Sequence, residues 1–260
     1  MGDLRGKTAL VTGASRGIGR SIAARLAADG ALVAVHYGNN EAAAEDTVAA
    51  IQRDGGQAFA VRAELGLAAG VGTDLDALFA GLADGLAGRP LDILVNNAAI
   101  ISYASTIDKA TQRDFDEAFA VNVRAPLFIT QRALPLMRDG GRIINVSSGV
   151  TWLATPEIVY AMTKGALNVF SRSLAQSQGA RGITVNTVSP GITETDMNTW
   201  LTEDAEAAQR VAEITALGRH GQPVDIADAV AFFASEDARW VTGQVLEVNG
   251  GLFLGPPVRR

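Results

Sequence analysis

The chain has 260 residues, 48% of them hydrophobic, which is enough for one large α/β domain or two small ones. Its net charge of −6 is spread over charges of both signs, so no basic face for nucleic acid is indicated. Cysteine is absent and histidine occurs only twice, which excludes a disulfide framework and a Cys-based metal site.

No stretch of the sequence resembles a secretory signal or a membrane span. The first residues carry charge, and no segment has the ~20 uninterrupted apolar residues that a bilayer-spanning helix needs. The lack of cysteine fits a reducing compartment. We therefore expect a cytoplasmic protein with no membrane partner, no nucleic-acid partner and no bound metal.

Short β-rich apolar segments alternate with alanine-rich helical segments along the chain. The predicted strands are residues 8–12, 31–37, 58–62, 91–95, 142–147, 183–188 and 244–248. The predicted helices, where apolar residues recur at helical spacing, include residues 17–29, 40–54, 125–138 and 157–178. Apolar strands between helices predict a parallel sheet covered on both faces and joined by right-handed crossovers. The expected fold is a single-domain, Rossmann-type, doubly wound α/β sheet over residues 1–260.

Three segments depart from this alternation. Residues 65–88 have a poorly defined helical pattern, and their glycine-rich start is expected to be a loop. Residues 193–216 begin with turn residues and continue as a polar, alanine-rich helical pattern, which predicts a lid over a substrate. Residues 255–260 contain two prolines and are expected to form a surface tail.

The first predicted strand runs directly into a glycine turn that opens a helix. Its spacing is Gly-x-x-x-Gly-x-Gly, rather than the Gly-x-Gly-x-x-Gly usually quoted for dinucleotide folds. Glycines allow the backbone to approach a pyrophosphate, and the helix N-terminus supplies N–H groups and a positive dipole end. An ordinary strand–turn–helix is the alternative reading. The residues predicted to hold a dinucleotide here are Gly13, Ser15, Arg16, Gly17, Ile18 and Gly19.

The end of the second predicted strand sets the choice of cofactor. An NAD site places a carboxylate there for the ribose hydroxyls, but this chain has His36, Tyr37 and Asn39, with no carboxylate before Glu41. These three residues are predicted to contact the cofactor. Arg16 in the glycine turn could reach a 2′-phosphate. We therefore predict that NADP(H) is preferred and that NAD(H) remains possible.

Tyr160 and Lys164 lie four residues apart in the helix predicted over residues 157–178, so they share one helix face. A phenol ionises near pH ~10, which is too high for acid–base chemistry at neutrality. A nearby ammonium group favours the phenolate and lowers that pKa. The pair could therefore hold a proton donor for a carbonyl oxygen, although such a pair also occurs by chance on exposed helices.

Together with these features, four further motifs resemble the short-chain dehydrogenase/reductase family, and the likeness covers nearly the whole chain in the right order. The last two motifs are similar to the 3-oxoacyl-carrier-protein reductase branch of that family. The four motifs are Asn96-Asn97-Ala98-Ala99, Asn122 in its helix, Ser189-Pro190-Gly191-Ile192-Thr193-Glu194-Thr195-Asp196-Met197, and the ending Val241-Thr242-Gly243-Gln244-Val245-Leu246-Glu247-Val248-Asn249-Gly250-Gly251.

The resemblance implies a ketoreductase in which Tyr160 donates a proton as hydride arrives from the nicotinamide. Lys164 would lower the tyrosine pKa and bind the nicotinamide ribose. Ser148 would hydrogen-bond the substrate oxygen, and Asn122 would hold a water that replenishes the proton. Counted back from Tyr160 with the usual family spacing, the serine would instead be Ser147; we choose Ser148 because it ends the strand.

The resemblance also extends the predicted cofactor site. Two positions depart from the family pattern: Ala99 replaces a glycine, and Glu64 replaces an adenine-contacting aspartate. Tyr160 and Lys164 are expected to contact the cofactor as well. The further residues predicted to line the cofactor are Glu64, Leu65, Asn97, Ala98, Ala99, Pro190, Gly191, Ile192, Thr193 and Thr195.

The substrate is expected to be a small carbonyl or alcohol, possibly bound to a carrier protein. Ile100, Tyr103, Trp152 and Leu153 follow the fourth and fifth strands and are candidate walls of its pocket. Family members are often tetramers, so we expect a homotetramer or a homodimer. Two other functions stay open: a catalytically silent cofactor-binding sensor or scaffold, and another reaction on the same scaffold such as enoyl reduction or epimerisation.

Overall fold

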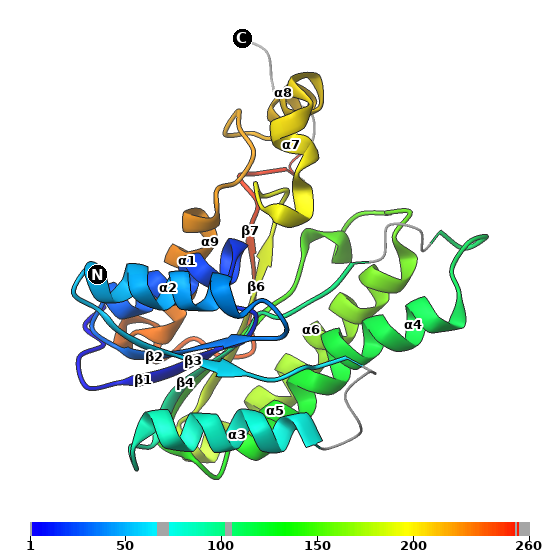
Figure 1. Cartoon of the computed structure of the whole chain (residues 1–260). Helices are drawn as coiled ribbons and strands as arrows, with labels where there is room; N and C mark the ends of the chain where they lie inside the picture. The colour runs from blue at the N-terminus through cyan, green and yellow to red at the C-terminus, as the bar shows by residue number, and fades with distance from the viewer. Residues whose placement is uncertain (1, 67–72, 102–105, 253, 255–260) are drawn as a thin grey trace.

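A seven-stranded parallel sheet with the order β3-β2-β1-β4-β5-β6-β7 runs through the centre of the molecule (Figure 1). The computed structural model describes residues 2–66, 73–101, 106–252 and 254. The predicted Rossmann-type fold is confirmed, since each predicted strand is present. The strands are β1 Thr8–Val11, β2 Leu32–Tyr37, β3 Gln57–Arg62, β4 Leu91–Asn96, β5 Met137–Val146, β6 Thr184–Pro190 and β7 Val245–Val248.

Helices cover both faces of this sheet, and several begin at local signals in the sequence. Asn40 caps α2 by accepting a hydrogen bond from the Ala43 N–H at 3.1 Å. Pro223 stands in the first turn of α9, where a missing N–H costs nothing. The helices are α1 Gly17–Ala28, α2 Glu41–Arg53, α3 Thr73–Leu86, α4 Gln112–Phe119, α5 Ala125–Ala133, α6 Ile158–Gln178, α7 Trp200–Glu203, α8 Ala205–Ile214 and α9 Pro223–Ala234, and a π-helix over Ala120–Arg124 joins α4 to α5.

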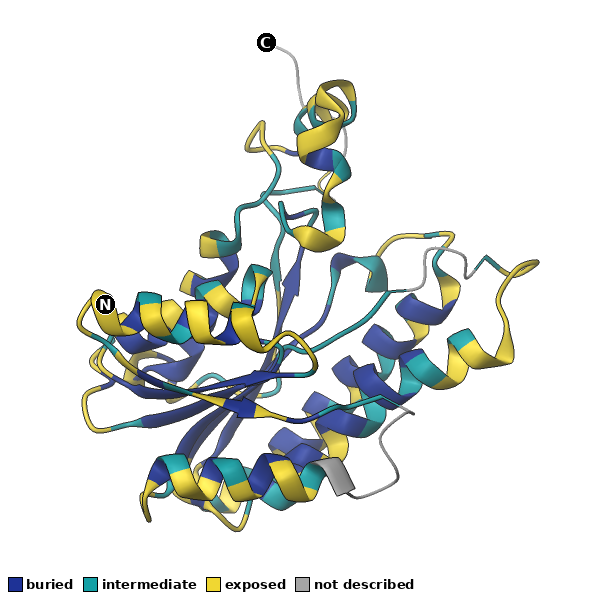
Figure 2. Cartoon of the chain, in the orientation of Figure 1, coloured by how far each residue is buried: buried dark blue, intermediate teal, exposed yellow. Residues whose placement is uncertain are grey.

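Successive strand residues face opposite sides of the sheet and feed two separate cores (Figure 2). Val11 packs with α1, α2 and α9 on one face, whereas Leu10 packs with α3, α5 and α6 on the other. Each fully buried aliphatic side chain of this kind stabilises the fold by ~1.5–3 kcal/mol. Because all strands are parallel, their carboxyl ends meet at one edge, where open α/β sheets bind their ligands.

One predicted boundary is wrong. The helix expected over residues 125–138 ends at Ala133, and β5 already begins at Met137 rather than at residue 142. Pro135 explains the difference, since it has no N–H to donate and its ring blocks a continuing helix.

In the segment over residues 65–88, whose helical pattern was poorly defined, helix α3 begins at Thr73. Residues 67–72 and the predicted tail over residues 255–260 lie outside the described residues.

The segment predicted as a lid contains α7 and α8, which project beyond the carboxyl edge of the sheet (Figure 1). Most of its surface is exposed, although Leu201 and Val211 are buried (Figure 2). Its function as a lid stays a prediction. Of the helices formed by the described residues, none combines the length and apolar character needed to cross a membrane.

Candidate active site

Tyr160 and Lys164 lie on consecutive turns of α6, and both are almost completely buried at 8% and 2% exposure. The Lys164 ammonium lies 5.5 Å from the centre of the Tyr160 ring. It donates a hydrogen bond to the Val146 carbonyl at the end of β5, at 2.8 Å. The structure thus brings the predicted phenol and ammonium together at the carboxyl edge of the sheet.

Burial changes the protonation of this lysine. Removing the ammonium from water disfavours its charged form and lowers the pKa of Lys164 to about 8. The group is therefore still mostly protonated at neutral pH. Because an ammonium has three N–H groups and one is used on Val146, two remain available to other acceptors.

The two serines at the end of β5 have different surroundings. Ser147 is buried, and its hydroxyl donates to the Lys164 backbone carbonyl at 3.3 Å. Ser148 is half-buried and caps the short 3₁₀ turn over Gly149–Thr151, with its oxygen 3.4 Å from the Val150 nitrogen. The Ser147 hydroxyl is thus directed at the backbone of α6, whereas the Ser148 hydroxyl makes one long contact.

Asn122 lies in the π-helix between α4 and α5, and π-helical turns are frequent at functional sites. Its carbonyl oxygen accepts from the Ile100 N–H, and its amide donates to the Ile100 carbonyl, both at 2.9 Å. The amide also donates to the Thr163 hydroxyl at 3.1 Å, and that hydroxyl donates to the Tyr160 carbonyl at 2.7 Å. The Asn122 side chain therefore joins the segment after β4 to the turn of α6 that carries Tyr160.

The glycine turn has the form that a phosphate cradle requires. Gly13 and Gly17 have φ values of 62° and 54°, which favour glycine. A methyl group on Gly19 would lie 2.2 Å from the Gly13 carbonyl oxygen, so the turn and α1 pack without room for a side chain. Among the described residues no side chain caps the first turn of α1, which leaves its N–H groups available to an anion.

Arg16 of this turn is exposed and lies near the start of the lid segment. Its guanidinium is 3.8 Å from the Asp196 carboxylate. Thr195 lies against Gly17, since a methyl group on that glycine would be 3.5 Å from the threonine side chain. The predicted lid thus starts beside the predicted cofactor turn.

The side chains predicted at the end of β2 are mostly used within the protein. His36 and Tyr37 are buried at 2% and 5% exposure, and Tyr37 donates to Glu41 at 3.1 Å. Asn39 is exposed. A cofactor contact at His36 or Tyr37 would therefore have to come from the backbone, whereas Arg16 and Asn39 can offer side chains.

The other predicted cofactor residues follow β3, β4 and β6 at the same edge. Asn97 donates its amide to the carbonyls of Thr12 and Gly13, at 2.8 and 3.0 Å, so it supports the glycine turn directly. Gly191 approaches Asn249 so closely that a methyl group would lie 2.8 Å from its Cα. The residues that the structure describes as half-buried at these strand ends are Glu64, Leu65, Asn97, Ala98, Ala99, Gly191, Ile192 and Thr195, while Pro190 and Thr193 are buried.

The predicted pocket walls differ in exposure. Trp152 and Leu153 are 69% and 49% exposed on the turn after β5, so neither is a core residue. Ile100 is half-buried after β4. Tyr103 lies outside the described residues. Two large apolar side chains are therefore exposed on the segment that follows Ser148.

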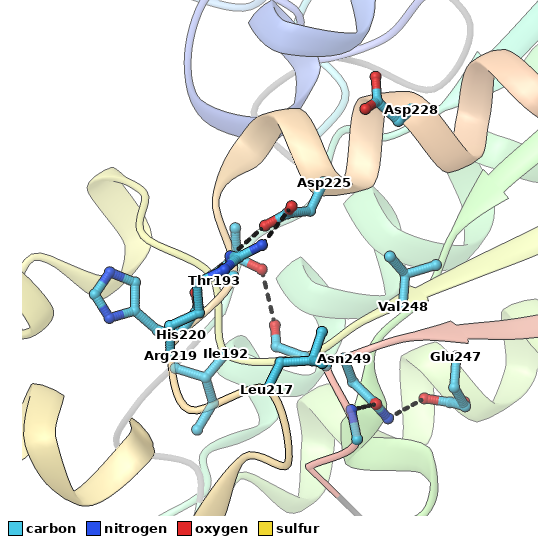
Figure 3. A pocket seen from close by; sticks show the side chains of 14 residues that line it. Ile192, Thr193, Leu217, Arg219, His220, Asp225, Asp228, Glu247, Val248 and Asn249 are labelled. Carbon is cyan, nitrogen blue, oxygen red and sulfur yellow. Dashed lines mark hydrogen bonds and ion pairs between the residues drawn. The ribbon is translucent and has the colours of Figure 1, made fainter. Parts of the chain in front are cut away.

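A cavity of about 390 Å³ lies beside the turn after β6, and no pattern in the sequence indicated it. Its lining includes Gly191 and Thr193 of the predicted site but neither Tyr160 nor Lys164. Figure 3 shows Arg219 paired with Asp225 at its rim, where the two bonds are 2.7 and 2.8 Å long. Among the described side chains, no three His, Cys, Asp or Glu residues cluster as a metal site.

Comparison with known proteins identifies the family. A family model described as enoyl-(acyl carrier protein) reductase matches residues 13–253. An uncharacterised oxidoreductase of Methylorubrum extorquens is 45% identical over 97% of this chain and 100% of its own length. The 3-oxoacyl-[acyl-carrier-protein] reductase FabG of Staphylococcus aureus is 38% identical over 95% of this chain and 98% of its own.

Solved structures agree with this assignment. The reductase LugOII, which catalyses keto-reduction at C1 during lugdunomycin biosynthesis, superposes with a TM-score of 0.91 at 49% identity, over 97% of this chain and 100% of its own. The angucycline C-6 ketoreductase LanV with bound NADP gives 0.90 at 49% identity, over 98% of both chains. LanV with NADP and rabelomycin gives 0.87, over 98% of this chain and 99% of its own. The chain belongs to the short-chain dehydrogenase/reductase family and is an oxidoreductase acting on CH–OH and C=O groups.

The buried ammonium predicts a pH-dependent stability that Lys164→Met should remove. Between pH 8 and pH 10.5 the unfolded chain holds a proton that the folded chain has released, so wild-type stability should rise with pH in this window. The full difference is ~3 kcal/mol for a shift of this size. Urea unfolding of both proteins without nucleotide, compared at each pH, measures it. If the free energies of unfolding of the two proteins changed with pH in the same way, burial would not perturb the pKa of this lysine.

Proposed function

We propose that this protein is an NADP(H)-dependent ketoreductase that interconverts a ketone and a secondary alcohol at the edge where α6 meets β5. The observation that carries the proposal is the burial of the Lys164 ammonium beside Tyr160, with its nitrogen held on the Val146 carbonyl. An ammonium at this position favours negative charge on the phenol oxygen. Tyr160 can therefore donate a proton to a substrate oxygen, and the ammonium of Lys164 then stabilises the phenolate that remains.

The residues present fit a dinucleotide. The glycine turn has no room for a side chain at Gly13 or Gly19, and the first turn of α1 has N–H groups to offer a pyrophosphate. Arg16 supplies an exposed cation for a 2′-phosphate, which favours NADP(H) over NAD(H). When bound, NADPH would supply the hydride. The bound NADP of LanV supports this choice.

The remaining roles follow from the surroundings of each side chain. Ser148 is the proposed partner of the substrate oxygen, because the Ser147 hydroxyl is directed at α6. Lys164 has two further N–H groups that can donate to the nicotinamide ribose. Asn122 is the proposed holder of a relay water. Since both N–H groups of its side-chain amide donate to Ile100 and Thr163, that water would have to donate to an oxygen atom of Asn122.

We further propose a polycyclic ketone of the angucycline type as substrate. The 49% identity to LanV and LugOII supports this class, and so do the exposed Trp152 and Leu153 beside Ser148. The flat indole ring of Trp152 is suited to packing on fused rings. A carrier-bound 3-oxoacyl chain is the second candidate, supported by the likeness to FabG.

We also propose that the active form is a homotetramer or a homodimer. Leu127 and Phe128 on α5 and Val169 on α6 are large apolar residues left between 41% and 57% exposed. Large apolar side chains left at the surface of two helices support an interface with a second copy of the chain. The expected cytoplasmic location and the lid function of residues 193–216 stay predictions.

Replacing the phenol tests the proposed chemistry. Tyr160→Phe should lower kcat/KM by about 10²–10⁴-fold, the usual contribution of a positioned general acid. The assay is loss of NADPH absorbance with a panel of polycyclic ketones and 3-oxoacyl thioesters, run in parallel with NADH. NADPH binding by fluorescence should be retained in the variant, which controls for folding. Full turnover by Tyr160→Phe would remove this residue from the mechanism, and tight NADPH binding without turnover by the wild type would favour a silent sensor.

The two serines can be separated by the same assay. Ser148→Ala should lower kcat by about 10²–10³-fold, because a donor to the developing negative charge is lost. Ser147→Ala loses one hydrogen bond of 3.3 Å to α6 and should cost much less. The opposite order of effects would assign the catalytic hydroxyl to Ser147.

A further inference from the structure

The peptide groups around Gly13 are held by side chains from both strands that flank β1. On the β2 side, the Gly13 N–H donates to the Nδ1 atom of His36 at 3.0 Å. On the β4 side, the Gly13 carbonyl accepts from the Asn97 amide at 3.0 Å. The backbone adds one more bond, from the Ala14 N–H to the His36 carbonyl at 2.8 Å. The first bend of the glycine turn is therefore fixed from two directions.

The hydrogen bonds of His36 determine its tautomer. Its Nε2 atom lies 3.0 Å from the Ala63 carbonyl after β3, and a carbonyl can only accept, so Nε2 carries the hydrogen. Nδ1 then has the lone pair that accepts the Gly13 N–H. Burial lowers the pKa of His36 to about 4, so the ring is neutral at physiological pH. A neutral ring with hydrogen on Nε2 satisfies both partners at once.

The Gly13 peptide in turn lies against the helix that would hold the phosphates. Gly13 has a left-handed φ of 62°, and its carbonyl oxygen lies so close to Gly19 of α1 that a methyl group there would be 2.2 Å away. A rotation of this peptide would push its oxygen into the first turn of α1 or away from Asn97. The Gly13 carbonyl belongs to the Gly13–Ala14 peptide, whereas the Gly13 N–H belongs to the preceding Thr12–Gly13 peptide. Because the two peptides meet at the Gly13 Cα atom, the direction of that N–H is linked through the Gly13 carbonyl to the N–H groups at the start of α1.

We propose that the His36 imidazole is a positioning residue of the dinucleotide site, which fixes the Thr12–Gly13 peptide and thereby the approach of the turn to the pyrophosphate. The inference rests on the proposed function, since it assigns this residue a part in binding NADP(H). At 2% exposure the ring is not accessible to the cofactor and acts through Gly13. It is the β2 counterpart of Asn97, which holds the carbonyl of the same residue.

Two substitutions separate this role from simple packing. His36→Asn places an amide oxygen at the position of Nδ1, so it can keep the bond from Gly13 and lose the bond to Ala63. His36→Leu fills similar space and keeps neither bond. The Kd of NADPH, measured by fluorescence titration, should rise about tenfold or more in the Leu variant and by less than about threefold in the Asn variant. The KM for NADPH should follow the Kd, while kcat changes less.

Unchanged NADPH binding by His36→Leu, or equal weakening in both variants, would overturn the inference. The wild-type protein provides a second readout that does not depend on how the variants fold. The chain has two histidines, so ¹⁵N-histidine NMR shows only two rings. One ring should be the neutral Nε2–H tautomer at neutral pH; hydrogen on Nδ1 of His36, or a protonated His36 ring, would also overturn it. Wild-type protein that binds no NADPH would instead count against the proposed function, while the tautomer would still test the contact.

Discussion

The candidate site depends on keeping the Lys164 ammonium inside the protein, next to Tyr160. Burial of a cation is costly, and here the cost appears as a pKa lowered to about 8. The group keeps one strong contact, with the Val146 carbonyl at the end of β5. A charge held in this way has a fixed position, which an exposed lysine on a flexible stem would not have. Its electrostatic effect on the phenol is also stronger than it would be in water.

The rest of the fold serves to position that pair. Parallel strands bring the ends of β1, β4, β5 and β6 to one edge, so the glycine turn, Asn97, Ser148 and Gly191 gather around the same place. Helix α6 is then joined to the sheet by Ser147 and Lys164 and to the π-helix by Thr163. These contacts are buried, and a buried polar group without its partner is costly, so they define one position of the helix.

Much of this arrangement could be predicted from the sequence. The apolar strand segments predicted the parallel sheet. The spacing of Tyr160 and Lys164 predicted that they share one helix face, which the structure confirms. The end of α5 was missed because helical periodicity continues past Pro135, while the ring of that proline stops the helix.

Contacts between distant segments could not be predicted, because spacing within one element says nothing about partners in another. The three bonds of Asn122 depend on how the π-helix meets the segment after β4, at Ile100, and helix α6, at Thr163. His36 was predicted to contact the cofactor from its place at the end of β2, yet its ring nitrogens bond to Gly13 and Ala63, so the side chain acts within the protein. The cavity near Arg219 is likewise formed by segments that are separate in the sequence.

A crystal structure of the protein with NADPH bound tests the central claim most directly. The account predicts that the Tyr160 hydroxyl faces the reactive carbon of the nicotinamide across a space that fits a ketone oxygen. It also predicts that the Lys164 ammonium lies within hydrogen-bonding distance of the adjoining ribose. A phenol turned away from the ring, or a ribose beyond the reach of Lys164, would contradict it.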